Sequence, residues 1–221
     1  MRLRRKFRSR RGQSVVEFAL ILPVIMFLLL GMVEMGFAIN HNSSMVTATR
    51  QGARVGSELV DGTDRKGTNP SSAASQGVDT QIIAAVQGVL ISPGSPVDIS
   101  QVQTIQIFRA TDAGAMSGSS VNTWIPAYDA ITHLPNGPAI PGSVPTAYLS
   151  FSRKPLDTGN WDAKDRSGVS PAQSIGVRIT YTYKFVTPLG SLIKALGGSL
   201  FSNGQITMSD QTIMAMEPPS P

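Results

Sequence analysis

Residues 8–39, RSRRGQSVVEFALILPVIMFLLLGMVEMGFAI, decide how this chain is organised, because a cluster of arginines there meets a glycine and then a long apolar run. No charged residue occurs between positions 18 and 33, and the wider stretch 15–39 is interrupted only by Glu17, Pro23 and Glu34. A helix needs about 20 apolar residues to cross the hydrocarbon core of a bilayer. The stretch therefore predicts one membrane-spanning helix, and no other window of the sequence approaches this length.

The charges on either side of the apolar run predict its orientation. After the run, the next Lys or Arg is Arg50. Seven basic residues precede the run: Arg2, Arg4, Arg5, Lys6, Arg8, Arg10 and Arg11. Because Lys and Arg are retained on the cytoplasmic side of a span, we expect a cytoplasmic amino terminus and an extracytoplasmic chain from about residue 40 onward.

Glu17 lies near the start of the span, where a carboxylate needs a partner. Driving a charged side chain to the bilayer centre costs about 2.5–3.5 kcal/mol. Cleavage after Gly12 would give Gln13 a new α-amine, and Glu17 lies four residues further along on the same helical face. We predict that this amine neutralises the carboxylate of its own chain or of a packed neighbour. Glu34, in contrast, is expected at the outer interface with its carboxylate in water.

These residues also carry a resemblance to a known family. GQSVVE at 12–17 resembles the cleavage motif of type IV prepilins, in which a basic leader and a glycine precede a glutamate at the fifth mature position and an apolar helix. More narrowly, residues 10–39 with TATRQGARVGSELV at 47–60 resemble the TadE-like proteins, minor pseudopilins of the tight-adherence (Flp-type) pilus system. Two later stretches are similar to the carboxyl-terminal part of proteins in that family: VRITYTYKFVTPLG at 177–190 and ITMSDQTIMAMEP at 206–218.

The resemblance implies a role and a set of partners. It implies a non-catalytic pseudopilin-like protein for biogenesis and assembly of a tight-adherence pilus, processed by a prepilin peptidase after Gly12. Implied partners are the membrane, the peptidase and other pilin or pseudopilin subunits, without nucleic acid or a small-molecule substrate. The implied location is the cytoplasmic (inner) membrane, single-pass, in association with a pilus. Gly52, Ala53 and Arg54 match a family motif, although Gln51 stands where an acidic residue is expected.

The same patterns predict four parts of the chain. We expect a basic prepilin-type leader at 1–12, a transmembrane helix at 13–40, an extracytoplasmic helix at 41–61 that continues the span, and an extracytoplasmic α+β domain at 62–221. Within the span, Pro23 deprives a backbone carbonyl of its helical partner, which predicts a kink.

The part after the long helix is predicted to contain an antiparallel sheet, so the fold class is α+β. In the stretch 176–186, apolar and polar residues alternate, which is typical of a strand with one buried and one wet face. Other segments are assigned by composition and periodicity: strands at 97–109, 146–152, 175–186 and 205–216, a polar linker at 62–78, a helix at 79–91 capped by Asp79 or Thr80, a short helix at 188–201, and loops at 110–143 and 152–173.

Nothing in the sequence predicts a catalytic residue, a cofactor or a metal. The formal charge is +5, but without the seven leading basic residues the balance is about −2, which leaves no basic patch for nucleic acid. The absence of cysteine excludes disulfides and a cysteine nucleophile. His41 and His133 have no second ligand at metal spacing, and DTGNWDAKD at 157–165 does not match a calcium loop.

Two other interpretations remain open. In the first, the chain is an uncleaved single-pass anchor that presents an extracytoplasmic ligand-binding domain, and the Glu17 side chain extends to the inner membrane interface. In the other it is a secreted protein, because GFA at 36–38 has the small-x-small pattern of a signal-peptidase site. The three interpretations predict mature amino termini at Gln13, Met1 and Ile39, respectively.

Overall fold

The computed structural model describes most of the chain. The chain divides into two compact units. One unit comprises residues 1–38 and 184–205, and the other comprises residues 39–183 and 206–221. The structure describes residues 11–59, 72–129, 132, 134–140, 143, 145–154, 161, 165–166, 173–191 and 205–216. Most of the predicted leader, residues 1–10, lies outside these ranges.

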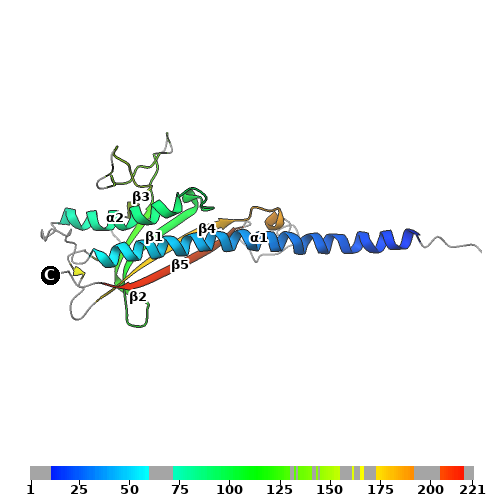
Figure 1. Cartoon of the computed structure of the whole chain (residues 1–221), viewed down its shortest axis with the longest axis horizontal. Helices are drawn as coiled ribbons and strands as arrows, with labels where there is room; N and C mark the ends of the chain where they lie inside the picture. The colour runs from blue at the N-terminus through cyan, green and yellow to red at the C-terminus, as the bar shows by residue number, and fades with distance from the viewer. Residues whose placement is uncertain are drawn as a thin grey trace, which may run out of the picture. The chain divides into compact units, whose positions relative to one another are not determined.

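The longest element is helix α1 (Arg11–Glu58), 48 residues without a break, drawn in blue to cyan in Figure 1. It runs through both the predicted span and the predicted extracytoplasmic helix, with Pro23 inside it. Within the described residues it is the one helix long and apolar enough to cross a membrane, judged by length and composition. Its large apolar side chains between positions 15 and 39 are exposed except that of Leu30, which is partly exposed, and this fits a single-pass membrane protein.

Within the described residues, five strands form one sheet in the order β3-β2-β1-β4-β5. Strand β1 is antiparallel to both β2 and β4, and β2 is antiparallel to β3. The strands are β1 (Val102–Ala110), β2 (Met116–Pro126), β3 (Phe151–Arg153), β4 (Ser174–Lys184) and β5 (Gln205–Ala215). A long amino-terminal helix followed by helices and an antiparallel sheet confirms the predicted α+β class.

Strand β2 was missed by the sequence analysis, which placed it in the loop 110–143. After Met116, its first residues, SGSS, are small and show no apolar alternation, so local periodicity carries no strand signal. Pairing with β1 decides the conformation, with Ile105 opposite Trp124 and Phe108 opposite Val121. The turn between the two strands uses Gly114 at φ +74°, a conformation that glycine adopts without strain.

Helix α2 (Ser72–Leu90) begins earlier than predicted. The sequence placed a linker at 62–78 and a cap at Asp79 or Thr80, but the helix starts at Ser72 and both of these residues lie buried inside it. The early residues SAASQGV are tolerated in a helix, and Val78 extends the buried face. The predicted cap is therefore wrong, and Asp79 has a different role described below.

Other sequence boundaries shift by a few residues. The strand predicted at 97–109 starts later because Ile99–Gln101 form the 3₁₀ helix η2, whose cap Asp98 accepts from the backbone N–H of Ser100 at 2.9 Å. The strand predicted at 146–152 is reduced to β3. Of the helix predicted at 188–201, residue 188 is in a turn, residues 189–191 are helical, and residues 192–201 lie outside the described residues.

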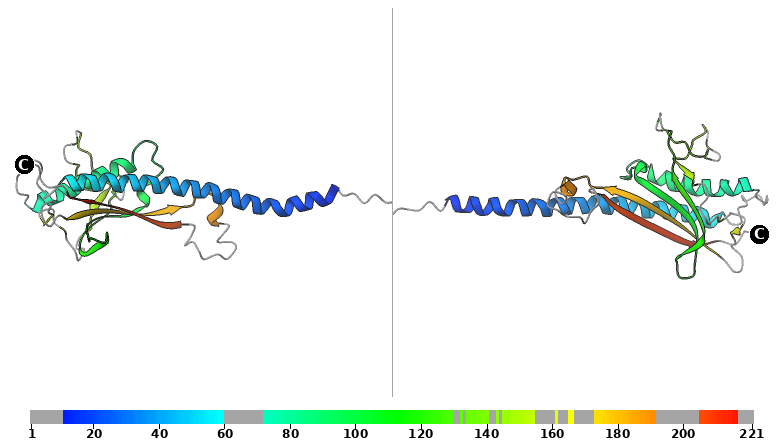
Figure 2. Two further views of the ribbon diagram at one scale, coloured as in Figure 1. Left: turned by 60° about the horizontal axis from the view of Figure 1, so that its bottom comes forward. Right: turned by 180° about the vertical axis from the view of Figure 1, so that it is seen from behind.

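The core of the larger unit lies where residues 39–58 of α1 and helix α2 pack side by side on one face of the sheet (Figure 2). The alternation predicted in β4 is confirmed, since Val177, Ile179 and Tyr181 are all buried. Gly52 of α1 permits the closest approach: a Cβ built there would lie 2.5 Å from Cγ2 of Val86 in α2 and 3.4 Å from Cγ1 of Val177 in β4.

A polar contact and a ring cluster also attach this part of α1 to the sheet. The buried hydroxyl of Thr49 donates to Oδ2 of Asp210 in β5 at 2.6 Å. The His41 ring lies edge-on to that of Tyr183, with centroids 5.0 Å apart, so His41 packs against β4. Burial raises the pKa of the neighbouring Tyr181 hydroxyl, which donates to Oε1 of Gln101 at 2.8 Å.

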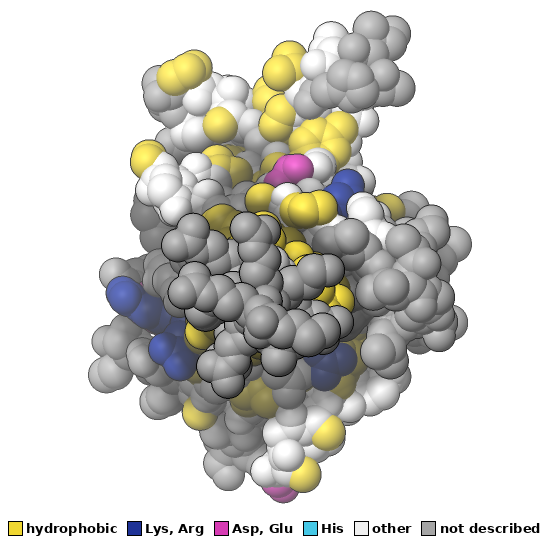
Figure 3. All heavy atoms as spheres, turned by 90° about the vertical axis from the view of Figure 1, so that its right-hand side faces the viewer, with side chains coloured by type: hydrophobic (Ala, Val, Ile, Leu, Met, Phe, Trp, Pro, Cys, Tyr) yellow, Lys and Arg dark blue, Asp and Glu magenta, His cyan; other side chains and the backbone are white. Residues whose placement is uncertain are grey.

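The chain between β2 and β3 carries exposed apolar side chains. In Figure 1 this part of the chain rises above β3. Figure 3 shows hydrophobic side chains at the same end of the molecule, at the top of the view. Leu134 and Tyr148 are the large exposed apolar residues of this loop within its described part.

Replacing Gly52 with alanine should destabilise the larger unit. Overpacking costs about 1–3 kcal/mol, and the better helix propensity of alanine offsets up to about 1 kcal/mol of it, so we expect a net loss of about 1–2 kcal/mol in the free energy of unfolding. Urea titration of the full chain in detergent micelles, followed by the fluorescence of the buried Trp124 and Trp161, measures it.

Gly88→Ala is the matched control. Gly88 also lies inside a helix, but a Cβ there meets nothing within 4 Å, so this change should stabilise by about 0.5–1 kcal/mol. Equal effects of the two substitutions would contradict the tight contact at Gly52.

Candidate functional site

The first turns of α1 bring together the residues predicted for processing. The helix begins at Arg11, so Gly12 and Gln13 lie in its first turn. The side-chain amide Nε2 of Gln13 donates to Oε1 of Glu17 at 2.9 Å, and both residues are exposed. Gln13 and Glu17 therefore share one helical face, one turn apart, as their spacing requires.

Gly12 has no structural reason to be glycine in this fold. A Cβ built at Gly12 meets nothing within 4 Å, and its backbone is helical, a conformation that other residues adopt more readily. Glycine in a helix is less favourable than alanine by about 1 kcal/mol. The described fold therefore gives no reason for glycine at this position.

Pro23 lies inside α1 without ending it. Membrane helices tolerate such a residue when neighbouring groups satisfy the freed carbonyl. The kink predicted at Pro23 stays a prediction.

Glu34 is placed differently from what the sequence suggested. Its side chain is only 4% exposed, so the expectation that its carboxylate reaches water is wrong. Oε1 accepts from the backbone N–H of Val186 at 3.0 Å, and Oε2 accepts from the backbone N–H of Thr187 at 2.9 Å and from its hydroxyl at 2.5 Å. Three donors to one carboxylate form a strong, charge-assisted cluster, and all three residues belong to the smaller unit.

No local pattern pointed to this Glu34 cluster, because its donors follow Glu34 by more than 150 positions in sequence. The one available signal was a charged residue in an apolar helix, which calls for a partner. The partner proved to be a loop that directly follows strand β4.

The family motif divides into two parts by environment. Gly52 and Ala53 are buried, and the packing of Gly52 explains its size. Arg54 is exposed, and its Nε lies 3.1 Å from Oε1 of Glu58 one turn along. Exposed pairs of this kind contribute little to stability, so a family role for Arg54 stays a prediction.

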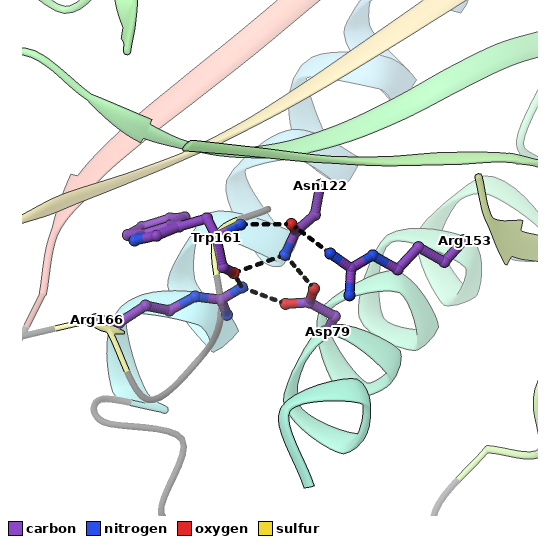
Figure 4. A network of polar contacts seen from close by, with 5 residues as sticks. All are labelled: Asp79, Asn122, Arg153, Trp161 and Arg166. Atoms are coloured by element: carbon purple, nitrogen blue, oxygen red, sulfur yellow. Dashed lines mark hydrogen bonds and ion pairs between the residues drawn. The ribbon is translucent and has the colours of Figure 1, made fainter. Parts of the chain in front are cut away.

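A second polar cluster lies buried between α2, β2 and the loop after β3 (Figure 4). Nη2 of Arg166 pairs with Oδ1 of Asp79 at 2.5 Å. The side-chain amide of Asn122 makes four hydrogen bonds. Its Nδ2 donates to Oδ2 of Asp79 at 2.6 Å and to the Trp161 carbonyl at 2.8 Å. Its Oδ1 accepts from the Trp161 backbone N–H at 2.9 Å and from Nη2 of Arg153 at 2.8 Å. The guanidinium of Arg166 also lies 4.7 Å from the centroid of the Trp161 ring. The cluster pins this loop to the core.

The residues considered for metal binding do not come together in the described part of the chain. His41 packs against β4, Asp165 is exposed, and His133, Asp157 and Asp162 lie outside the described residues. Among the described residues, no group of three or more histidines, aspartates or glutamates is arranged to hold a metal ion.

The fold and the apolar helix together define a class: a chain with one candidate membrane span at its amino-terminal end, continuous with an α+β domain. Residues 12–54 match the family model described as TadE-like protein, so this segment is TadE-like and the resemblance seen in the sequence is confirmed. The match covers the processing residues and the motif at 52–54, whereas the similarity at 177–190 and 206–218 stays a prediction. No curated protein and no solved structure matches the chain. The TadE-like match points to membrane association and a pilus-related role.

Asp79→Asn should be strongly destabilising, because it leaves the buried Arg166 without its counter-charge. Removing one partner of a buried ion pair costs about 3–5 kcal/mol. Denaturant unfolding of the full chain in micelles measures the loss. Asp98→Asn is the control: Asp98 is exposed and asparagine also serves as a cap, so we expect a change within about 0.5 kcal/mol. A loss below about 1 kcal/mol for Asp79→Asn would show that the pair is not needed.

Proposed function

We propose that this chain is a non-catalytic, pseudopilin-like membrane protein that takes part in assembly of a tight-adherence (Flp-type) pilus and is cleaved after Gly12 by a prepilin peptidase. The observation that carries the proposal is the start of α1, where an exposed Gln13–Glu17 pair directly follows a glycine that the fold does not need. The TadE-like match over residues 12–54 supports the pilus system.

Cleavage would change the electrostatics of this helix end. The new α-ammonium of Gln13 would lie at the positive end of the helix dipole, where a cation is unfavourable. Glu17 is one turn away and exposed, so its carboxylate is available to an ammonium. In a low-dielectric membrane this attraction is much stronger than in water. An ammonium on one chain paired with Glu17 of the next would therefore set the register between neighbouring subunits.

The exposed apolar surface of α1 supports the same proposal. Large side chains between positions 15 and 39 face outward, so this surface meets lipid before assembly and other subunits after it. We propose the leader at 1–12 in the cytoplasm, the span at 13–40 in the inner membrane, and the helix at 41–61 and the domain at 62–221 outside it. The partners are then the peptidase and other pilin or pseudopilin subunits.

Processing is tested by the intact mass and amino-terminal sequence of the protein recovered from membranes of a host with its own pilus machinery. We expect a mature chain that starts at Gln13, and a Gly12→Ala variant that stays uncut. Gly31→Ala is the matched control, because a Cβ there also meets nothing within 4 Å and the residue lies in the same helix; it should be cut normally. A wild-type chain that begins at Met1 would refute processing and favour the uncleaved anchor, and one that begins at Ile39 would indicate secretion.

Glu17→Gln separates cleavage from assembly. This variant keeps a polar side chain but loses the charge that attracts an ammonium. We therefore expect normal cleavage. The amount of this protein recovered with sheared pili should fall at least about tenfold relative to wild type, equivalent to about 1.4 kcal/mol. Glu58→Gln, an exposed position near the other end of α1, should leave recovery unchanged. Recovery of Glu17→Gln at the wild-type level would contradict the pairing.

A further inference from the structure

We propose that the segment formed by the last residue of β4 and the three residues after it, residues 184–187, rests on the outer surface of the lipid bilayer and is held at that level by Glu34. The proposal rests on the membrane span of the proposed function and adds a second lipid contact, far from the span in sequence. Its partner is the interface of a phospholipid bilayer.

The first step is that this segment is fixed to α1. Both carboxylate oxygens of Glu34 accept hydrogen bonds from Val186 and Thr187, and Glu34 is buried beneath them. Residues 1–38 and 184–205 form one compact unit. Wherever Glu34 lies relative to the bilayer, this short segment lies beside it.

The second step is the level of Glu34. Within the span proposed at 13–40, the hydrocarbon core takes about 20 helical residues at 1.5 Å each, so counted from residue 15 it ends near residue 34, and residues 35–40 lie in the outer headgroup region. Glu34 therefore lies at the outer boundary of the hydrocarbon. Backbone N–H groups without partners are costly in this environment, and the carboxylate supplies partners for two of them. The cluster thus allows an irregular piece of backbone to lie against lipid.

The third step is the chemistry of the exposed side chains. Val186 is 64% exposed, and on α1 the residue next to Glu34, Met35, is 62% exposed. Lys184, two positions before Val186, is also exposed. An apolar side chain at the boundary with a lysine close by suits the headgroup region, where the apolar stem enters lipid and the ammonium reaches phosphates. Continuity with the exposed apolar surface of α1 identifies lipid as the occupant.

Spin labels on single cysteines test the proposal in the full chain, which contains no cysteine of its own. Labels at Leu28, Met35, Val186 and Ile91 are compared after reconstitution into phosphatidylcholine vesicles. Ile91 is the matched control, since it is 58% exposed but lies in the other unit. Oxygen partitions into lipid and a nickel chelate into water, so the ratio of the two collision rates should be higher by about fivefold or more at positions 28, 35 and 186 than at 91.

The role of Glu34 is tested by the same labels in a Glu34→Ala background. We expect the ratio at position 186 to fall to that of position 91, while the ratio at position 28 stays unchanged. Thr187→Val, which removes one of the three donors and keeps the shape of the side chain, should give an intermediate ratio. A ratio at position 186 that stays high in Glu34→Ala would overturn the role of Glu34.

The remaining outcomes distinguish this proposal from the span itself. A water-like ratio at 186 with a lipid-like ratio at 28 overturns the surface contact and leaves the span intact. A water-like ratio at 28 overturns the span and the contact with it. A ratio at 186 that becomes water-like when the protein is diluted in lipid identifies a second copy of the chain as the occupant and overturns the lipid assignment.

Discussion

Helix α1 is uninterrupted, but its first part exposes its apolar side chains and its second part packs against protein. The rest of the structure depends on this change of surroundings along one helix. Between positions 15 and 39 its large apolar side chains are exposed, whereas further along, Met45, Ala48 and Ala53 are fully buried against protein. The glycines follow the same division. Gly52 is needed for close packing, while Gly12 and Gly31 have open space around them. Gly12 and Gly31 therefore make no close packing contact within the described part of this chain.

The two glutamates of the apolar stretch show the same division of labour. Glu34 is buried and its two oxygens accept three hydrogen bonds within its own chain. Glu17 is exposed and accepts from the amide of Gln13. A carboxylate that is already satisfied by a rigid local cluster gains little from another partner, whereas a carboxylate held by one neutral amide gains much from an ammonium. On this ground we propose Glu17 as the glutamate that pairs with another chain, whereas Glu34 makes its hydrogen bonds within its own chain.

The buried polar cluster around Asp79 affects the conformation of the larger unit and involves neither Glu17 nor Glu34. Asp79, Asn122 and Arg166 are nearly inaccessible to solvent and bond mainly to one another and to the Trp161 backbone. Buried ionic groups contribute little net stability compared with apolar packing, but they penalise any arrangement that leaves one of them unpaired. Here they fix the positions of Trp161 and Arg166 relative to α2 and β2.

The sequence by itself determined the features that depend on local periodicity and composition. These are the long apolar helix, its basic flank, the glycine and glutamate spacing at its start, and the alternation in β4, because each is written in consecutive residues. The tertiary structure alone decided the features whose partners are distant in sequence. Strand β2 lacks apolar alternation in its first half and depends on pairing with β1, and Asp79, predicted as a helix cap, proved to be half of an ion pair with Arg166. Glu34 is the clearest case, since the donors that bury it come from more than 150 residues away and no local pattern records a contact of that range.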